Sequence, residues 1–207
     1  MSETTTDGRV LRGDRTRRVV LGKAVDVASV EGLEGLSIGR LATELSISKS
    51  GLIAHFGSKE QLQLATVRAA RAIFVQSVID PALQSPPGIG RVRALIEAWL
   101  EYSSDRRFPG GCFFARAAHE YAGRQGPVRD AIAAADEEWG RLITRSITEA
   151  QEIGEIRADV DAGLLAFDLI ACLDSANLRS LLLESPTVYD QARRAVDQRL
   201  AAAATGA

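Results

Sequence analysis

The chain of 207 residues contains little cysteine and no long apolar run. Its two cysteines, Cys112 and Cys172, are too far apart for a local metal or redox motif, so we expect free thiols in a reducing cytoplasm. No apolar run approaches the roughly 18 residues that a membrane-spanning helix requires. The polar N-terminus, MSETTTDGRVLRGDRTRR, lacks the apolar segment of a secretory signal. These absences predict a cytoplasmic protein that does not enter a membrane.

The sequence also lacks the motifs of common catalytic sites. It contains no glycine-rich phosphate loop, no nucleophile paired with a base, and no metal-binding motif. Cys112, His119 and Glu120 are close in sequence, but their spacing matches no standard zinc site. We therefore expect a protein that is not an enzyme and that carries no cofactor and no metal.

Lysine is scarce, and the basic residues are unevenly placed. All three lysines, Lys23, Lys49 and Lys59, lie in the first 60 residues, and five of the 22 arginines lie between residues 9 and 18. Residues 1–68 contain ten basic and eight acidic residues, a net charge of +2, whereas residues 69–207 contain fifteen and nineteen, a net charge of −4. A basic end on an acidic body indicates an end that faces nucleic acid. A solvated basic tail has the same composition, so both interpretations stay open on this pattern alone.

Apolar spacing predicts an all-α fold. Residues at i, i+3 and i+4 recur along the chain, and the alternation typical of strands is absent. We expect three short helices before residue 57, the first of them ended by Gly32, then a connector helix over about 59–79 and a domain boundary at the loop SPPGIG (85–90). The terminal AAAATGA is of low complexity, and we expect it to be mobile. The later helices are expected at about 92–100, 110–121, 127–153, 160–183 and 188–203.

Two of the short helices have the spacing of a helix-turn-helix. Ser37 and Ser48 are suited to cap these helices, and the small Ala42 lets the pair approach closely. The outward positions of the second helix carry Lys49 and small residues, which suit entry into the DNA major groove, about 12 Å wide. A small helical hairpin inside an all-α protein would show the same spacing.

The run SIGRLATELSISKSGLIAHFGSKEQL (37–62) resembles the DNA-binding domain of the tetracycline-repressor (TetR) family, and the match extends over about 15–65. The resemblance implies an N-terminal three-helix helix-turn-helix domain, preceded by a basic flexible arm (1–14). It implies that the connector helix joins this domain to a larger helical ligand-binding and dimerisation domain (85–207). The expected function is that of a homodimeric repressor released from double-stranded operator DNA by a small-molecule effector. A helical adaptor, or an enzyme without DNA binding, remains the alternative, and sequence-specific DNA binding would separate these classes.

The resemblance also assigns residues to the DNA interface. It places the start of a helix at Ser37 against phosphate, puts Lys49 in the recognition helix, and gives backbone contacts to His55 and Lys59. The arginines of the arm and the start of the first helix, Arg17 among them, would reach the minor groove or phosphates, unless they form a disordered tail. Two residues depart from the family pattern. Ile53 replaces a frequent tyrosine, so one hydroxyl contact to phosphate is expected to be lost. Ser46 replaces a turn glycine, so a small backbone strain is expected there. The residues expected to contact DNA are Arg17, Ser37, Ser48, Lys49, Ser50, Gly51, His55 and Lys59.

The larger domain is expected to hold an apolar pocket with a few polar groups. Plain core packing would equally account for every candidate pocket residue. Helices 127–153 and 160–183 resemble the pair that forms a four-helix dimer interface, although a buried helix would show the same apolar stripe. The expected dimer face carries Ala171, Ser175, Leu178 and Leu182. The candidate ligand contacts are Trp99, Tyr102, Phe113, Phe114, His119 and Tyr121.

Overall fold

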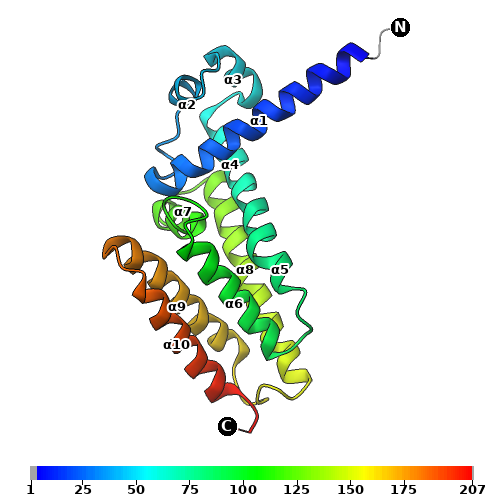
Figure 1. The fold of residues 1–207 in the computed structure, drawn as a ribbon, viewed down its shortest axis with the longest axis vertical. Helices are drawn as coiled ribbons and strands as arrows, with labels where there is room; N and C mark the ends of the chain where they lie inside the picture. Colours follow the sequence, from blue (N-terminus) through cyan, green and yellow to red (C-terminus); the bar gives the residue numbers. More distant parts are fainter. Residues whose placement is uncertain (1–3, 207) are drawn as a thin grey trace.

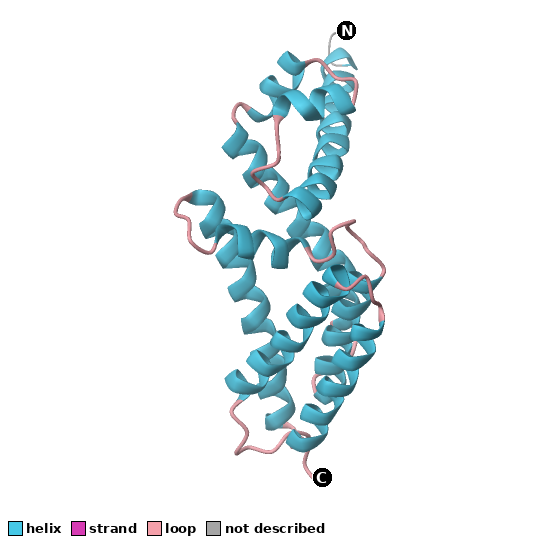
Figure 2. Ribbon diagram, turned by 90° about the vertical axis from the view of Figure 1, so that its left-hand side faces the viewer, coloured by secondary structure: helices cyan, strands magenta, loops and turns pink. Residues whose placement is uncertain are grey.

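The computed structural model describes residues 4–206, with side chains from residue 13 onward, and is built from helices (Figures 1 and 2). Within that range the only β pairing is an isolated bridge between Ile156 and Ala204. The predicted all-α fold is confirmed. The molecule is elongated, with the N-terminal helices at one end and the C-terminus at the other (Figure 1).

The N-terminal end consists of α1 (Thr4–Glu31), α2 (Ile38–Glu44) and α3 (Lys49–Phe56). Helix α1 ends where predicted, because Gly32 adopts a left-handed conformation (φ 85°) that glycine accepts without strain. Residues 4–14, which we expected to form a flexible arm, are helical and form the first turns of α1. No proline interrupts the chain there, and this part of α1 projects from the molecule (Figure 1).

Three serines fix the starts of the next helices, and the caps at Ser37 and Ser48 were predicted. The hydroxyl oxygens of Ser37, Ser48 and Ser58 each accept a hydrogen bond from the backbone N–H three residues ahead, at 3.4, 3.1 and 3.1 Å. Such a cap typically contributes about 1 kcal/mol and satisfies a backbone donor that the helix cannot. The caps therefore set where α3 begins, and with it the length of the turn before it.

The connector continues from α4 (Lys59–Phe74) through a π-helical turn, η1 (Val75–Ile79), into α5 (Asp80–Ala82). Pro81 has no N–H to donate, and its ring would clash with a carbonyl one turn earlier in a regular α-helix, so the helix widens just before it. The run Lys59–Ala82 is long and apolar enough to cross a membrane by length and composition alone. Many of its apolar side chains are buried core residues of α4 and η1, as is usual for core helices of soluble proteins.

The body consists of α6 (Ile89–Ser104), α7 (Phe113–Tyr121), α8 (Pro127–Glu152), α9 (Ala162–Leu182) and α10 (Thr187–Ala203). The short α7 lies next to the N-terminal helices, and α9 and α10 lie side by side along one flank (Figure 1). The ends of the last three helices are close to those expected from the sequence.

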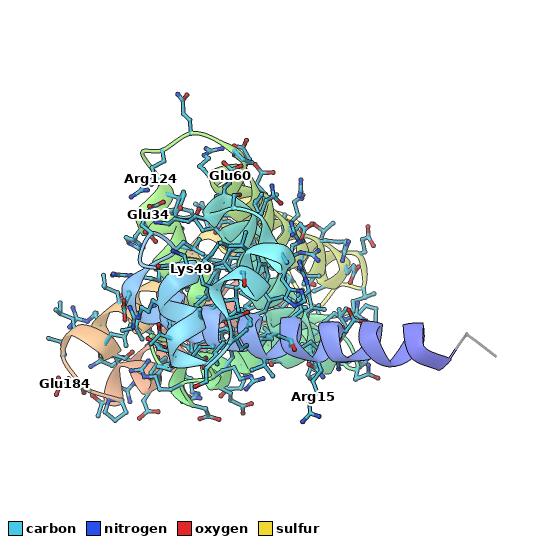
Figure 3. The ribbon with its side chains drawn as sticks, turned by 90° about the horizontal axis from the view of Figure 1, so that it is seen from above. Arg15, Glu34, Lys49, Glu60, Arg124 and Glu184 are labelled. Carbon is cyan, nitrogen blue, oxygen red and sulfur yellow. The ribbon has the colours of Figure 1, made fainter. Side chains whose placement is uncertain are left out.

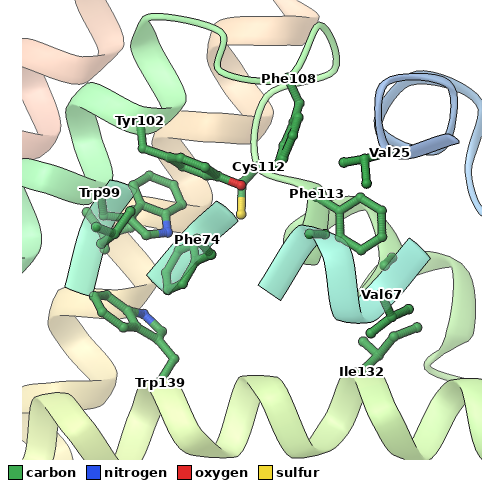
Figure 4. Packing of buried hydrophobic residues seen from close by; sticks show 14 of the residues in the cluster. Val25, Val67, Phe74, Trp99, Tyr102, Phe108, Cys112, Phe113, Ile132 and Trp139 are labelled. Carbon is green, nitrogen blue, oxygen red and sulfur yellow. The ribbon is translucent and has the colours of Figure 1, made fainter. Parts of the chain in front are cut away.

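The core of the body is organised around Phe74 of the connector. Its ring makes edge contacts with the rings of Tyr102, Phe114 and Trp139, with 5.4, 6.0 and 5.3 Å between centroids (Figure 4). Interplanar angles of 80° to 90° give the T-shaped arrangement that aromatic pairs prefer. The connector is therefore an integral part of the body and not a detached linker.

The expectation of a mobile C-terminal tail was wrong for residues 201–206. The backbone N–H of Arg157 donates to the carbonyl of Ala203 at 3.0 Å, and its guanidinium donates to the carbonyl of Ala202. Thr205 is tied in the same way, because its N–H donates to the carbonyl of Glu155 at 3.0 Å. The loop between α8 and α9 therefore satisfies the last carbonyl groups of α10, which composition alone could not reveal. Ala207 lies outside the described residues.

Candidate nucleic-acid interface and cavity

Helix α3 lies at the end of the molecule away from the C-terminus (Figure 1), and Lys49 at its start is labelled in the view from that end (Figure 3). Leu52 and Phe56 are buried beneath it and fix its position. The helix contains no acidic residue, and Lys49 has no ion-pair partner among the residues that the structure describes. No acidic residue of α3 would therefore repel a polyanion, and the mostly small side chains of the outer face would allow its close approach. The exposed positions are Lys49, Ser50, Ile53 and Ala54.

The turn before α3 is tight and strained at one residue. Ser46 has a positive φ of 54°, a conformation that L-residues other than glycine rarely adopt. The N–H of Ile47 then donates to the carbonyl of Ala42 at 2.9 Å, and the Ile47 side chain packs against the core. The expected strain at Ser46 is confirmed, and the turn keeps the helix-turn-helix geometry despite it.

Arg17 of α1 contacts the C-terminal end of α3 in the free protein. Its guanidinium donates to the backbone carbonyl of His55 at 2.9 Å and lies over the Phe56 ring, with 4.8 Å from Cζ to the ring centroid. Both contacts are at the C-terminal end of α3, where the helix dipole favours positive charge. The exposed Arg15 and Arg18 have no ion-pair partner within residues 13–206, so both remain available for contact with DNA.

Lys59, expected to contact phosphate, is held by Glu34 in the loop before α2. Its ammonium group lies 3.0 Å from the Glu34 carboxylate and donates to the Glu34 carbonyl at 2.7 Å. The carboxylate also accepts from the Tyr121 hydroxyl at 2.9 Å and from the Gln63 amide at 3.2 Å, and Arg124 lies 3.1 Å away (Figure 3). These bonds, chiefly those from Lys59 and Tyr121, lower the pKa of Glu34 from 4.5 to about 2. We call these five residues the Glu34 cluster.

Helix α7 and the loop before it make a second contact with the N-terminal helices. The Glu120 carboxylate accepts from the backbone N–H groups of Leu33 at 2.7 Å and Glu34 at 2.9 Å. The N–H of Gly110 donates to the Ser29 hydroxyl at 3.1 Å. A Cβ at Gly110 would lie 1.9 Å from the Ser29 carbonyl oxygen, so only glycine permits this approach. The N-terminal end is thus joined to the body at α7 as well as through the connector.

A cavity of about 100 Å³ lies among the connector, α6, α7, α8 and α9. Helix α7 contributes residues from its first turns through His119, while its last residues, Glu120 and Tyr121, hold the loop before α2. One short helix therefore borders the cavity and the N-terminal end. The aromatic lining comprises Phe74, Trp99, Phe114 and Trp139, three of which are labelled in Figure 4.

The cavity includes three of the predicted ligand contacts, Trp99, Phe114 and His119. The other three candidates do not line the cavity and have packing or hydrogen-bonding roles instead. Tyr102 packs on Phe108 and Phe74, Phe113 is fully buried, and Tyr121 belongs to the Glu34 cluster. Sequence reasoning missed Phe74 and Trp139, because a stripe of apolar residues on a helix gives no sign of which ones border a void.

The charged residues at the cavity are mostly acidic. The Arg71 guanidinium is bound to Glu138, with distances of 2.8 Å from Nε and 2.6 Å from Nη2 to one carboxylate oxygen. Asp136 and Asp174 have no hydrogen bond or ion pair within the described part of the chain. Partial burial raises the pKa of Asp174, the charge of Asp136 raises it further, and His119 opposes both. Among described residues, no group of three or more side chains could hold a metal ion.

Two protein-family models match the chain. Residues 20–66 match the model described as bacterial regulatory proteins, tetR family. Residues 88–196 match the model described as tetracyclin repressor-like, C-terminal domain. The first covers the helix-turn-helix and the start of the connector, and the second covers most of the body.

Similar proteins extend over nearly the whole chain. The HTH-type transcriptional repressor DhaR of Mycobacterium sp. (strain GP1) is 25% identical over 177 residues, which cover 84% of this chain and 87% of that protein. The structure of a TetR transcriptional regulator from Chloroflexus aurantiacus J-10-FL is similar with a TM-score of 0.86 and 25% identity, covering 93% and 98% of the two chains. AibR, crystallised with isovaleryl coenzyme A and operator DNA, shares the fold, with a TM-score of 0.67, 21% identity and coverage of 90% and 97%.

Proposed function

The chain belongs to the tetR family of bacterial regulatory proteins and is a transcriptional regulator, and we propose that it is a homodimeric repressor released from operator DNA by a small molecule. Members of this family are soluble cytoplasmic regulators and not enzymes, and we place this chain in the cytoplasm with them. The observation that carries the proposal is the outer face of α3, which is exposed and contains no acidic residue. On its other side, Arg17 donates a hydrogen bond to the carbonyl of His55.

In this proposal α3 enters the major groove. Lys49 and Ser50 lie in its first turn, where backbone N–H groups and the helix dipole also attract phosphate. Ala54 and Ile53, one turn later, offer apolar contacts to base edges. Gly51 has a structural role in addition, because a Cβ there would lie 2.9 Å from the capping Ser48 Oγ. Lys59 would have to leave Glu34 to contact phosphate, so we assign the main phosphate contacts to Lys49, Arg15 and Arg18.

The dimer contact is proposed on α9. Most of the large apolar side chains that are exposed in the single chain lie on this helix or just after it, including Phe167 (69% exposed) and Leu182 (75% exposed). Leu164, Phe167, Leu178 and Leu182 share one face at helical spacing, with Ala171 and Ser175 between them. An apolar stripe of this length favours a partner surface.

The second helix of the dimer contact is proposed to be α10, in place of the expected 127–153 segment. The outward face of α8 is charged, with Glu137, Arg141 and Arg145 exposed, and is a poor candidate for a buried contact. Between α9 and α10 lies a groove whose lining includes the small residues Ala171, Ser175 and Ala195, beside the paired Asp168 and Arg199. Small residues let a second pair of helices approach closely, which favours a four-helix contact built from α9 and α10 of two copies.

The cavity is proposed as the effector site, and α7 as a route from it to the DNA-binding end. Effector binding would weaken DNA binding by favouring a state in which the two α3 helices no longer match one helical turn, roughly 34 Å. A shift of α7 at Phe114 or His119 would act on Glu120 and Tyr121, which hold the loop before α2. The connector supplies a second route, since Phe74, Val75 and Ile79 also line the cavity.

The proposal is tested by selecting duplexes from a random library with the full chain and sequencing those retained. We expect enrichment of an inverted repeat whose half-site centres are about one helical turn apart. Retained duplexes that match the input library would remove the claim of sequence-specific DNA binding. An enriched single half-site without a repeat would contradict the dimer.

A further inference from the structure

The lining of the cavity contains four aromatic rings. Both tryptophans of the chain, Trp99 and Trp139, are among them. The face of an aromatic ring carries negative electrostatic potential, and a cation within about 6 Å of it gains roughly 0.5–2 kcal/mol. A void lined by several such rings therefore favours a positive ligand over a neutral one of the same shape.

Two carboxylates at the same cavity have no direct ion-pair partner among the described residues, although the charge of His119 partly compensates Asp174. Asp136 of α8 and Asp174 of α9 both line it, and neither has a hydrogen bond or ion pair within the described residues. Their negative charges repel each other, since the charge of Asp136 raises the pKa of Asp174. A positive ligand between them would relieve this repulsion, whereas a neutral ligand would leave it in place.

The basic groups at the cavity do not supply a site for an anion. Arg71 is the only arginine among the described lining residues, no lysine is present, and both guanidinium contacts of Arg71 go to Glu138. The remaining basic group is His119, whose Nδ1 lies 2.7 Å from the carbonyl oxygen of Ala115. Because a carbonyl oxygen only accepts, this Nδ1 carries a proton and donates it. A carboxylate or phosphate ligand would thus meet two acidic residues and no unpaired arginine or lysine.

We propose that the effector is a compact organic cation whose nitrogen is fully or largely alkylated, held by the aromatic rings with Asp136 and Asp174 as its counter-charges. This inference rests on the proposed role of the cavity as the effector site. The volume of about 100 Å³ is below the roughly 300–1,000 Å³ of pockets for drug-sized ligands, so the ligand is small. Alkyl groups on the nitrogen match the aromatic wall, and Asp136 and Asp174 then act as counter-charges and not as hydrogen-bond acceptors.

The two tryptophans make the cavity directly observable. Trp99 and Trp139 both line the cavity, and the chain has no other tryptophan. A change in intrinsic tryptophan emission therefore reports on this cavity. The probe is tetramethylammonium chloride, titrated into the free full-length protein. The controls are sodium chloride at the same concentration and tert-butanol, a neutral molecule of similar size. We expect a saturable change with tetramethylammonium and none with either control.

Charge variants test the counter-charges. We expect Asp174→Asn and Asp136→Asn each to weaken tetramethylammonium binding about fivefold or more. The matched control is Glu137→Gln, which removes one negative charge from α8 at a residue that does not line the cavity, and it should bind as the parent chain does. Asp136 and Glu137 are solvent-exposed and Asp174 is partly buried, so thermal melting should change little in these three variants.

Three results would overturn the inference: no saturable response to tetramethylammonium, an equal response to tert-butanol, or equal affinity in the two Asn variants and the Glu137→Gln control. The assay contains no DNA. A negative result would therefore disprove cation binding in the cavity. It would not bear on sequence-specific DNA binding, which the duplex selection tests separately.

Discussion

At the scale of single residues, the DNA-binding end contains two lysines whose surroundings differ. Lys49 is exposed and unpaired among the described residues, whereas Lys59 is bound to the carboxylate and carbonyl of Glu34. Phosphate neutralisation makes binding salt-dependent in proportion to the number of contacts. A lysine that is already paired must give up one partner to gain another, so the two lysines should contribute unequally.

We predict that Lys49→Ala weakens binding to selected and random duplexes by similar factors. It should lower the slope of log affinity against log salt by about two for a dimer, one for each lost contact. Lys59→Ala should lower the slope by less. Salt titrations of both variants by fluorescence anisotropy decide this, and a larger loss for Lys59→Ala would reverse the assignment.

A second residue-scale prediction concerns two buried tyrosines. The Tyr102 hydroxyl is buried and has no well-formed hydrogen bond among described residues. Burial raises its pKa, although the Phe113 backbone is close enough to oppose that rise. The Tyr189 hydroxyl, in contrast, is bonded to Ser103, Ser180 and Arg106. Removing an unsatisfied buried hydroxyl relieves its desolvation, so Tyr102→Phe should raise the free energy of unfolding by about 1 kcal/mol. Tyr189→Phe, the matched control, should lower it by about 1–3 kcal/mol. Urea denaturation measures both, and destabilisation by Tyr102→Phe would show that its hydroxyl has a partner.

At the scale of elements, the sequence predicted what depends on neighbours along the chain. Ser37, Ser48 and Ser58 cap their helices, and Gly32 ends α1, because each acts on backbone within one turn of itself. The strain at Ser46 was predictable for the same reason. These local rules located the helix-turn-helix without any tertiary information.

The contacts that hold the elements together were not predictable in this way. Arg17 meets a carbonyl 38 residues further along the chain, and Glu34 gathers groups from α4, α7 and the loop after α7. Sequence reasoning assigned Arg17 and Lys59 to DNA and Tyr121 to a ligand, because the sequence does not show which side chains meet across the fold. Asp174 is a similar case, since it lies among the apolar residues of α9 and its place at the cavity follows only from how α7, α8 and α9 pack.

The Glu34 cluster yields an element-scale prediction about pH. The folded-state pKa of Glu34 is lowered from 4.5 to about 2, so its ionised form stabilises the fold above pH 4.5, and this contribution is lost as the pH falls toward 2. Glu34→Gln removes the titrating group. The melting temperature of the variant should therefore lie below that of the parent chain at pH 5 to 7, with the difference shrinking between about pH 4.5 and 2. A difference that does not change over this range would show that the Glu34 charge does not contribute.

At the scale of the whole molecule, DNA recognition and self-association are proposed to depend on different parts of the structure. Helix α3 lies at one end, and the apolar stripe of α9 lies on the body (Figure 1). A dimer holds two copies of α3 at a fixed separation, so that each copy raises the effective concentration of the other at its half-site. Loss of the dimer should therefore weaken DNA binding without any change in α3.

We predict that Phe167→Glu converts the dimer to a monomer and weakens binding to the inverted repeat about 100-fold or more. The matched control is Leu83→Glu, which places the same charge on an exposed leucine outside α9 and should leave both properties unchanged. Sedimentation velocity reports the association state and anisotropy reports DNA affinity. If the Phe167→Glu variant remains dimeric, the dimer interface does not include this face of α9.

The central claim is that α3 enters the DNA major groove, and the most direct test places a negative charge on its outer face. Ala54→Glu directs a carboxylate from α3 toward the phosphates and base edges, while Ala72→Glu makes the same change at an exposed alanine of α4. On a duplex obtained by the selection described above, we expect Ala54→Glu to bind at least about tenfold more weakly, since like charges across an interface cost several kcal/mol. Ala72→Glu should bind as the parent chain does. Equal affinity of the two variants for this duplex would show that α3 does not read DNA.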